Sequence, residues 1–311
     1  MSGQRALIIG ARRRNQGLGE FIAQYFHEQG AEVCGIVGTS PTSVEEALHH
    51  LKNRYGIHTQ GFTDLPEAIE RSQPNIMVIA SPNQYHLEHL QVAAKYKLSC
   101  LCEKPLFWKD HEPLVQREVE TLVDRFHRNG KLLQLVTQWP CTLDDFFSLY
   151  PDAKNEPLQR LSMLLGPVSS GINRVVDSLP HVLSMIHSLV GIGSVKNVSG
   201  YQEDEKRLKV SFDYHHAGGH LEVKVILVQS PERPRPAGYA LNSSLVWRTI
   251  RQKDYQMFFS GNSGERIRVK DPLKKLVRRF LDDLENGQPT DRETIVASMT
   301  DLNKIVENLN L

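Results

Sequence analysis

The stretch from residue 76 to residue 105 limits the folds open to this 311-residue chain more than any other part. Ile76 to Ala80 is an apolar run rich in β-branched residues, which predicts a strand buried on both faces. A Ser81-Pro82-Asn83 break, a helical pattern from Tyr85 to Lys97 and a second apolar run, Ser99 to Cys102, follow. This order predicts a right-handed βαβ crossover and therefore a parallel sheet.

Polar residues gather where these two strands end. Ser81, Pro82 and Asn83 follow the first strand, and Glu103-Lys104-Pro105 follows the second. Open α/β sheets bind their ligands at the carboxyl ends of the strands. We therefore expect a ligand site at this edge, formed by Ser81, Pro82, Asn83, His86, Glu103 and Lys104.

The same residues carry a family resemblance. A strand ending in a Ser-Pro-Asn turn, a histidine at the helix start and a strand ending in Glu-Lys-Pro resemble the Gfo/Idh/MocA oxidoreductases, the family of glucose–fructose oxidoreductase and inositol dehydrogenase. The resemblance extends over the whole chain and is strongest over residues 6–105. It implies an enzyme that transfers a hydride between a nicotinamide cofactor and a carbinol or carbonyl carbon of a small polar substrate, such as a sugar or polyol derivative. It also implies that Lys104 is the catalytic lysine beside the nicotinamide.

The N-terminal segment contains a glycine-rich turn between a strand and a helix. Ala6 to Ile9 reads as a buried strand, and the helix that follows the turn ends at Gly30. Free N–H groups and the helix dipole at such a turn hold a pyrophosphate in dinucleotide-binding folds. The arginines that follow Gly10 are either a solvated loop or lie over cofactor phosphates. The cofactor-binding residues predicted here are Gly10, Arg12, Arg13, Gly17 and Gly19.

The second strand predicts which cofactor is preferred. Glu32 to Val37 ends at Gly38-Thr39-Ser40, where NAD-preferring proteins usually place an acid on the ribose 2′-hydroxyl. Because hydroxyls and a nearby arginine accommodate a 2′-phosphate instead, Thr39 and Ser40 favour NADP, with NAD as the alternative. The next helix is expected over Ser43–Tyr55, with Ser43 as N-cap and Glu46 completing a capping box.

The chain is expected to form two domains. Residues 1–138 predict an α/β Rossmann domain with a doubly wound parallel sheet, ending with a helix over about 111–129 and a strand over 132–137. Residues 139–311 predict an α+β domain with a mostly antiparallel, open-faced sheet, because short alternating strands recur there between helices. In the resembled family this open face commonly makes subunit contacts, which implies a homodimer or homotetramer.

The second domain contributes two further catalytic candidates. Asp177 and His181 stand at positions i and i+4 of a helix expected over residues 176–190, so both side chains lie on one face. Pro180 suggests that the helix proper begins there, which would place His181 in the first turn and favour a neutral imidazole. The resembled family has Asp-x-Gly-x-His here, and this chain lacks the glycine. The expected mechanism has His181 exchanging the hydroxyl proton, Lys104 holding the alkoxide and Asp177 orienting His181.

Other functions stay open. Tyr150 and Lys154 have the spacing of the short-chain dehydrogenases, with Thr137 upstream, but Pro151 argues against one continuous helix. An imine or enone reductase of a biosynthetic pathway would use the same cofactor site. A non-catalytic NAD(P)-binding regulatory protein would explain the irregular glycine spacing and the missing glycine before His181.

Composition excludes several classes of partner. A net charge of +1 gives no electrostatic reason to expect nucleic acid or an acidic membrane, and no apolar run approaches the roughly 20 residues of a membrane span. No signal-peptide layout precedes the first strand, which favours a cytoplasmic protein with a small-molecule substrate. No metal site is expected, because candidate ligands straddle a hairpin and the cysteines read as reduced core thiols. These candidate residues are Asp213, His215, His216 and His220, and the cysteines are Cys34, Cys100, Cys102 and Cys141.

Overall fold

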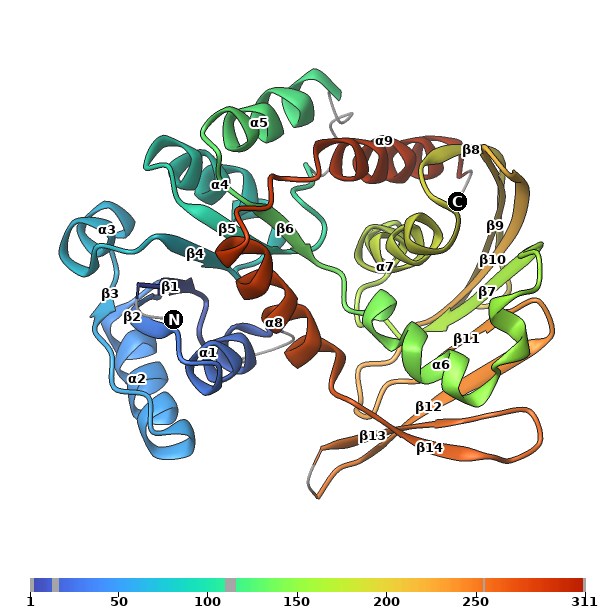
Figure 1. The fold of residues 1–311 in the computed structure, drawn as a ribbon, viewed down its shortest axis with the longest axis horizontal. Helices are drawn as coiled ribbons and strands as arrows, with labels where there is room; N and C mark the ends of the chain where they lie inside the picture. The colour runs from blue at the N-terminus through green and yellow to red at the C-terminus, as the bar shows by residue number, and fades with distance from the viewer. Residues whose placement is uncertain (1–2, 13–16, 110–115, 254, 310–311) are drawn as a thin grey trace. The chain divides into compact units, whose positions relative to one another are not determined.

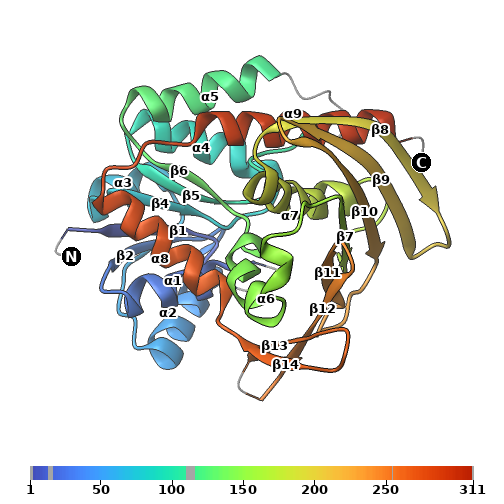
Figure 2. The same cartoon turned by 45° about the vertical axis from the view of Figure 1, so that its right-hand side comes forward.

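The computed structural model describes residues 3–12, 17–109, 116–253 and 255–309. The chain forms two compact units (Figures 1 and 2), the first made of Met1–Val136 with Leu273–Arg292 and the second of Thr137–Pro272 with Glu293–Leu311. The predicted cofactor residue Arg13 and the first part of the helix predicted over 111–129 lie outside the described residues.

The first unit contains a six-stranded parallel sheet with the order β3-β2-β1-β4-β5-β6. Its strands are β1 (Arg5–Ile9), β2 (Glu32–Val37), β3 (Gly61–Phe62), β4 (Ile76–Ile79), β5 (Ser99–Glu103) and β6 (Leu133–Val136). Its helices are α1 (Gly19–Glu28), α2 (Pro41–Tyr55), α3 (Leu65–Ser72), the 3₁₀ helix η1 (Asn83–Tyr85), α4 (His86–Lys95), α5 (Gln116–Arg128) and α8 (Pro272–Glu285). The predicted doubly wound Rossmann architecture is confirmed.

Strand β4 lies at the centre of this sheet. All four of its residues are buried, and it pairs in parallel with β1 on one side and β5 on the other. The chain runs from β1 to β2 in one direction and from β4 to β5 in the other. Since such connections are right-handed, α1 and α4 cover opposite faces of the sheet. The carboxyl ends of β1 and β4 are therefore adjacent at the point where the strand order reverses, the usual ligand-binding place in this architecture.

Helix α8 completes the first unit although it follows the second sheet in the chain. It lies beside α1 in both views, where Phe280 packs against Phe26 with ring centroids 6.1 Å apart. Lys274 donates to the Glu28 carboxylate at 2.6 Å. Beyond the helix, the buried Thr290 hydroxyl accepts from the Leu133 N–H at 2.8 Å and donates to the Lys131 carbonyl at 2.6 Å, which fastens this segment to the edge strand β6.

The second unit contains an eight-stranded sheet with the order β14-β13-β12-β11-β7-β10-β9-β8, in which only the pair β10–β7 is parallel. Its strands are β7 (Arg160–Leu165), β8 (Gly193–Gln202), β9 (Arg207–His216), β10 (Gly219–Val228), β11 (Ala237–Leu241), β12 (Ser244–Arg251), β13 (Gln256–Ser260) and β14 (Arg266–Val269). Its helices are η2 (Trp139–Thr142), α6 (Leu143–Leu149), η3 (Asp152–Lys154), α7 (Asn173–Val190) and α9 (Arg292–Asn308). Alternate residues of β9 are buried, so the predicted mostly antiparallel sheet with one covered face is confirmed.

The start of α2 differs from the prediction. Ser40, not Ser43, is the N-cap: its hydroxyl accepts from the Ser43 N–H at 3.2 Å, and the Ser43 hydroxyl accepts from the Ser40 N–H at 3.1 Å. Pro41 occupies the first helical position, where its missing N–H costs nothing and its fixed φ favours the helix. The predicted capping box between Ser43 and Glu46 is wrong, and Glu46 lies one turn inside the helix.

The start of α7 also differs from the prediction. The helix begins at Asn173 and Pro180 lies inside it, so His181 is in the middle of the helix and the dipole argument for a first-turn histidine does not apply. Pro180 removes one backbone hydrogen bond, the one to Val176. Burial of one face of the helix offsets this loss, and its buried residues include Val175, Val176, Leu179, Val182 and Leu183.

The remaining predictions concern thiols, metals and membranes. The four cysteines are free thiols, and burial raises the pKa of Cys34. Within the described ranges, no group of three or more histidine, cysteine or acidic side chains is arranged to hold a metal ion. A search of the same residues finds no helix with the length and apolarity needed to cross a membrane.

We predict that Ser40→Ala lowers the free energy of unfolding of the cofactor-free protein by about 1 kcal/mol, because the helix loses its N-cap acceptor. Thr39→Ala is the matched control, since Thr39 is exposed and its hydroxyl caps nothing. Urea denaturation followed by circular dichroism measures both variants. Equal stabilities of the two variants would contradict the assigned cap.

Candidate functional site

The glycine-rich turn packs against the end of β4. Gly10 has φ +82°, and a Cβ at this position would lie 2.6 Å from the Ala80 carbonyl oxygen. A Cβ on Gly19 would collide with the Gly10 carbonyl group, whereas Gly17 has no neighbour closer than 3.7 Å to such an atom. Gly10 and Gly19 therefore let the turn and the start of α1 approach the sheet. A side chain at position 17 would meet no such steric conflict.

The Glu-Lys-Pro segment is tied to this turn. Glu103, at the end of β5, accepts a hydrogen bond from the Leu18 N–H at 2.9 Å, just before α1 begins. The N-cap residue Leu18 makes no capping bond with its own side chain, and the Glu103 carboxylate takes up the Leu18 N–H at the helix N-terminus. Glu103, which was predicted to bind the cofactor, thus holds the glycine-rich turn in place.

His86 connects the other two turns. Its ring is buried, with Nδ1 2.9 Å from the Pro105 carbonyl oxygen and Nε2 2.8 Å from the Ser81 carbonyl oxygen. The Ser81 hydroxyl lies 3.1 Å from Nδ1 of His89. Burial lowers the pKa of His86, although its carbonyl contacts oppose the shift, and burial also lowers the pKa of His89.

The first unit therefore brings most of the predicted residues to one edge of its sheet. Lys104 is half-buried there, between Glu103 and the buried Pro105. The residues that share this edge are Gly10, Gly19, Ser81, Pro82, Asn83, His86, Glu103 and Lys104.

The end of β2 carries contacts that were not predicted. Thr39 is exposed, and the Ser40 hydroxyl caps α2. Arg12 forms an ion pair with Glu46 of α2. The end of β2 has no acidic residue of its own, but this carboxylate lies near it. Sequence reasoning missed this pair because nothing in either segment marks the other as its partner.

These residues fit a dinucleotide. Gly10 and Gly19 have no side chain to keep a ligand from the backbone, and the N-cap residue of α1, Leu18, makes no side-chain capping bond, which is the arrangement that accepts a pyrophosphate. Gly10, Gly19 and the N–H groups of the first turn of α1 would hold the phosphates. Ser81, Asn83 and Lys104 would lie towards the other end of the cofactor, which supplies hydride chemistry when bound.

Asp177 and His181 lie on helix α7 of the second unit. Both are half-buried and share one partly exposed stripe of the helix with Ser184, whose hydroxyl donates to the His181 carbonyl at 2.9 Å. The Ser169 hydroxyl donates to the Asp177 carboxylate. Ser169 was not predicted, and a serine in the loop before the helix was the only signal for it.

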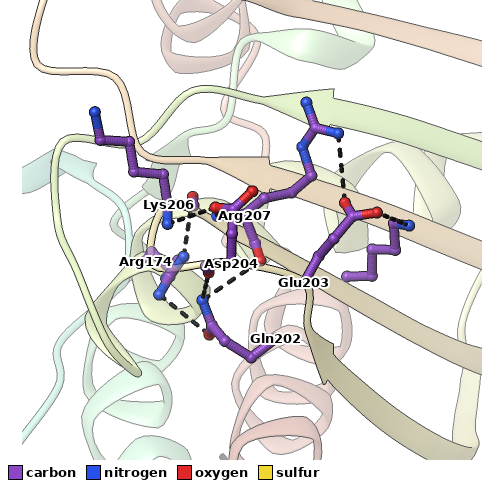
Figure 3. Close-up of polar contacts among 7 residues, drawn as sticks. Arg174, Gln202, Glu203, Asp204, Lys206 and Arg207 are labelled. Carbon is purple, nitrogen blue, oxygen red and sulfur yellow. Dashed lines mark hydrogen bonds and ion pairs between the residues drawn. The ribbon is translucent and has the colours of Figure 1, made fainter.

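A buried guanidinium anchors the first turn of the same helix (Figure 3). Arg174 donates to the Gly171 carbonyl at 3.3 Å, to the Lys206 carbonyl at 3.1 Å and to the Gln202 amide oxygen at 3.3 Å. In the adjoining turn, Asp204 accepts from the backbone N–H groups of residues 206 and 207, contacts that lower its pKa. Arg174 therefore fixes the first turn of α7 against the β8–β9 turn. Asp177 and His181 stand three and seven residues after it, on the same side of the helix.

Two surface hollows lie between α4 and α5, with volumes of about 400 and 520 Å³. Cationic side chains line them, and none of the predicted site residues does. The lining residues with ionisable side chains are Lys95, Arg117, Glu118, Arg125 and Arg128.

Comparisons with known proteins agree with this fold. Residues 4–136 match the family described as an oxidoreductase family with an NAD-binding Rossmann fold. The comparison with curated proteins found no match.

Solved structures are similar over the whole chain at low identity. UDP-N-acetylglucosamine 3-dehydrogenase from Acidithiobacillus ferrooxidans has a TM-score of 0.71 at 14% identity, covering 99% of this chain and 98% of that one. Levoglucosan dehydrogenase in complex with NADH and levoglucosan has a TM-score of 0.69 at 13% identity, covering 98% of this chain and 96% of that one. KijD10, a 3-ketoreductase from Actinomadura kijaniata in complex with NADP and TDP-benzene, has a TM-score of 0.73 at 13% identity, covering 99% of this chain and 98% of that one. These likenesses show the fold. The family match therefore assigns residues 4–136 to the NAD-binding Rossmann domain of the Gfo/Idh/MocA oxidoreductases.

Proposed function

We propose that the chain transfers a hydride between a nicotinamide cofactor and a carbinol or carbonyl carbon of a small polar substrate, such as a sugar or polyol derivative. The observation that carries the proposal is that Glu103 and His86 join three turns at one sheet edge. Lys104 lies in the chain between Glu103 and Pro105, the residue whose carbonyl His86 contacts. This edge lies in the domain that matches an NAD-binding oxidoreductase family.

Each catalytic candidate has a role that its chemistry supports. Lys104 stabilises the negative charge that develops on the substrate oxygen, because a half-buried ammonium acts in a medium of low dielectric. His181 exchanges the hydroxyl proton, and Asp177 orients it from the same stripe of α7. The bond from Ser169 supports the role of Asp177, since it restrains the carboxylate.

The alternatives differ in how much supports them. The short-chain dehydrogenase alternative lacks support, because Tyr150 follows the end of α6, Lys154 lies in the separate helix η3, and the Tyr150 hydroxyl donates to the Leu245 carbonyl at 2.7 Å. An imine or enone reductase and a non-catalytic NAD(P)-binding regulator would have the same first unit. A substrate panel of sugars, polyols, nucleotide sugars, cyclic imines and enones separates these three.

NADP is the proposed cofactor. The first turn of α2 contains no acid, and the positive end of its dipole favours a 2′-phosphate near Thr39 and Ser40. Arg12 would supply a positive charge to that phosphate once it leaves Glu46. The carboxylate of Glu46 competes with the phosphate for Arg12, so it limits the preference.

We also propose a homo-oligomer, formed through the sheet face of the second unit that lies opposite α7. Leu164 pairs with Ile226 on one side and Gly238 on the other, and Gly238 pairs with Trp247. This apolar row crosses four strands, and Trp247 is 43% exposed. Leu164 and Ile226 are half-buried, and a partly exposed apolar row of this kind is typical of a protein interface.

The function is tested by Lys104→Met, with Lys95→Met on α4 as the control. Nicotinamide absorbance with the best substrate of the panel measures turnover, and fluorescence titration measures the dissociation constant (Kd) for NADPH. Lys104→Met should lower kcat by at least about a hundredfold and preserve Kd, because an electrostatic stabiliser is lost. His181→Ala should flatten one limb of the pH–rate profile. NADPH binding without turnover of any substrate would favour the regulatory alternative.

Cofactor preference is tested by binding titrations with NADPH and NADH. The wild-type protein should bind NADPH more tightly, and Thr39→Asp should reverse the order because a carboxylate repels the 2′-phosphate. Glu46→Gln should strengthen NADPH binding and leave NADH binding unchanged, because it releases Arg12. A wild-type preference for NADH would refute this assignment.

The oligomer is tested by Trp247→Lys, with Ile192→Lys as a control at a site 41% exposed outside the row. Light scattering coupled to size-exclusion chromatography should show an oligomer for the wild type and the control. Trp247→Lys should give the monomer, because a charge replaces the largest apolar contact of the row. A wild-type monomer at high concentration would end this proposal.

A further inference from the structure

His86 links the carboxyl ends of two neighbouring strands from a single position. It is the first residue of α4 and is 1% exposed. Its Nδ1 faces the Pro105 carbonyl, directly after Lys104, and its Nε2 faces the Ser81 carbonyl, directly after the end of β4. Both distances are those of normal hydrogen bonds, so one ring contacts both turns.

The two contacts compete for one proton. A carbonyl oxygen only accepts, and a neutral imidazole has one N–H, so it donates to one of the two carbonyls at a time. Burial and the charge of nearby Lys104 lower the pKa of His86, which disfavours the cation that would satisfy both. The two tautomers therefore hold different parts of the site: one holds the backbone beside Lys104, and the other holds the Ser81 turn.

The backbone at Lys104 has a restraint on each side. On the N-terminal side of Lys104, Glu103 accepts a hydrogen bond from the Leu18 N–H. On its C-terminal side, the Pro105 carbonyl contacts His86. A long lysine side chain amplifies any backbone shift at its base, and a displacement of about 1 Å costs about a hundredfold in rate. Loss of the contact between His86 and the Pro105 carbonyl would therefore displace Lys104 and lower the rate of turnover.

We propose that His86 is a positioning residue with two separable effects: its Nδ1 contact fixes Lys104 for turnover, and its Nε2 contact fixes the Ser81 turn for cofactor binding. This proposal rests on the proposed function. It deepens that function by adding a residue that touches neither substrate nor reacting atoms.

Two conservative variants separate the effects. An asparagine amide nitrogen takes the place of Nδ1, and a glutamine amide nitrogen takes the place of Nε2. His86→Asn therefore keeps the contact to Pro105 and loses the one to Ser81, while His86→Gln does the reverse. His86→Ala loses both, and His127→Gln on α5, an exposed position, is the control.

The measurements are kcat at saturating substrate, the Kd for NADPH without substrate, and the melting temperature. His86→Gln should lower kcat by about 10- to 100-fold with Kd within about twofold of the wild type. His86→Asn should weaken NADPH binding about tenfold with kcat near the wild type. Parallel losses of kcat and Kd in both variants, following the melting temperature, would show a merely structural histidine and overturn the proposal.

Failure of the proposed function gives a different result. A wild-type protein that binds NADPH but turns over no substrate would refute the enzyme assignment alone. The titrations still decide the cofactor half of the proposal, because His86→Asn must bind NADPH more weakly than His86→Gln. Equal Kd values for the two variants would overturn it.

Discussion

The parallel pairing of β1 with β4 is the constraint on which the rest of the first unit depends. Ala6 to Ile9 pair in register with Ile76 to Ile79, so the chain leaves both strands at the same edge. The glycine-rich turn and the Ser81 turn then lie so close that a Cβ on Gly10 would strike the Ala80 carbonyl. The apolar composition of both strands sets the pairing, and the pairing sets the position of the site.

A small set of polar contacts converts this edge into a defined arrangement of backbone. Glu103 holds the turn before α1, and His86 holds the backbone on the far side of Lys104 and the turn after β4. The bond to Glu103 involves a charged group, and such bonds contribute about 1.5–3 kcal/mol each, more than bonds between neutral groups. The residues flanking Lys104 therefore have a physical role of their own, since they couple its position to both turns expected to contact a cofactor.

Much of this arrangement could be predicted from local patterns. Strand β2 occupies the predicted residues, because a buried apolar run of this length between turn residues favours a strand. The cap of α2 was wrong because Ser40 and Ser43 stand three residues apart and either could begin the helix; Pro41 at the first position decides for Ser40. The start of α7 was wrong because Pro180 reads as a helix start, whereas burial of the surrounding apolar face allows it inside.

Contacts between distant segments could not be predicted in the same way. The ion pair of Arg12 with Glu46 and the bond from Leu18 to Glu103 depend on how turns meet after the sheet has formed. Family resemblance pointed to Lys104 and His86 but not to the carbonyl contacts of the histidine. The catalytic roles of Lys104, Asp177 and His181 stay predictions.

A crystal structure with NADP bound tests the central claim most directly. The account predicts the pyrophosphate over the turn from Gly10 to Gly19 and the nicotinamide ring beside Lys104, between the Ser81 turn and the end of β5. NADP bound with its adenine end beside Lys104, or in the cationic hollows between α4 and α5, would contradict it.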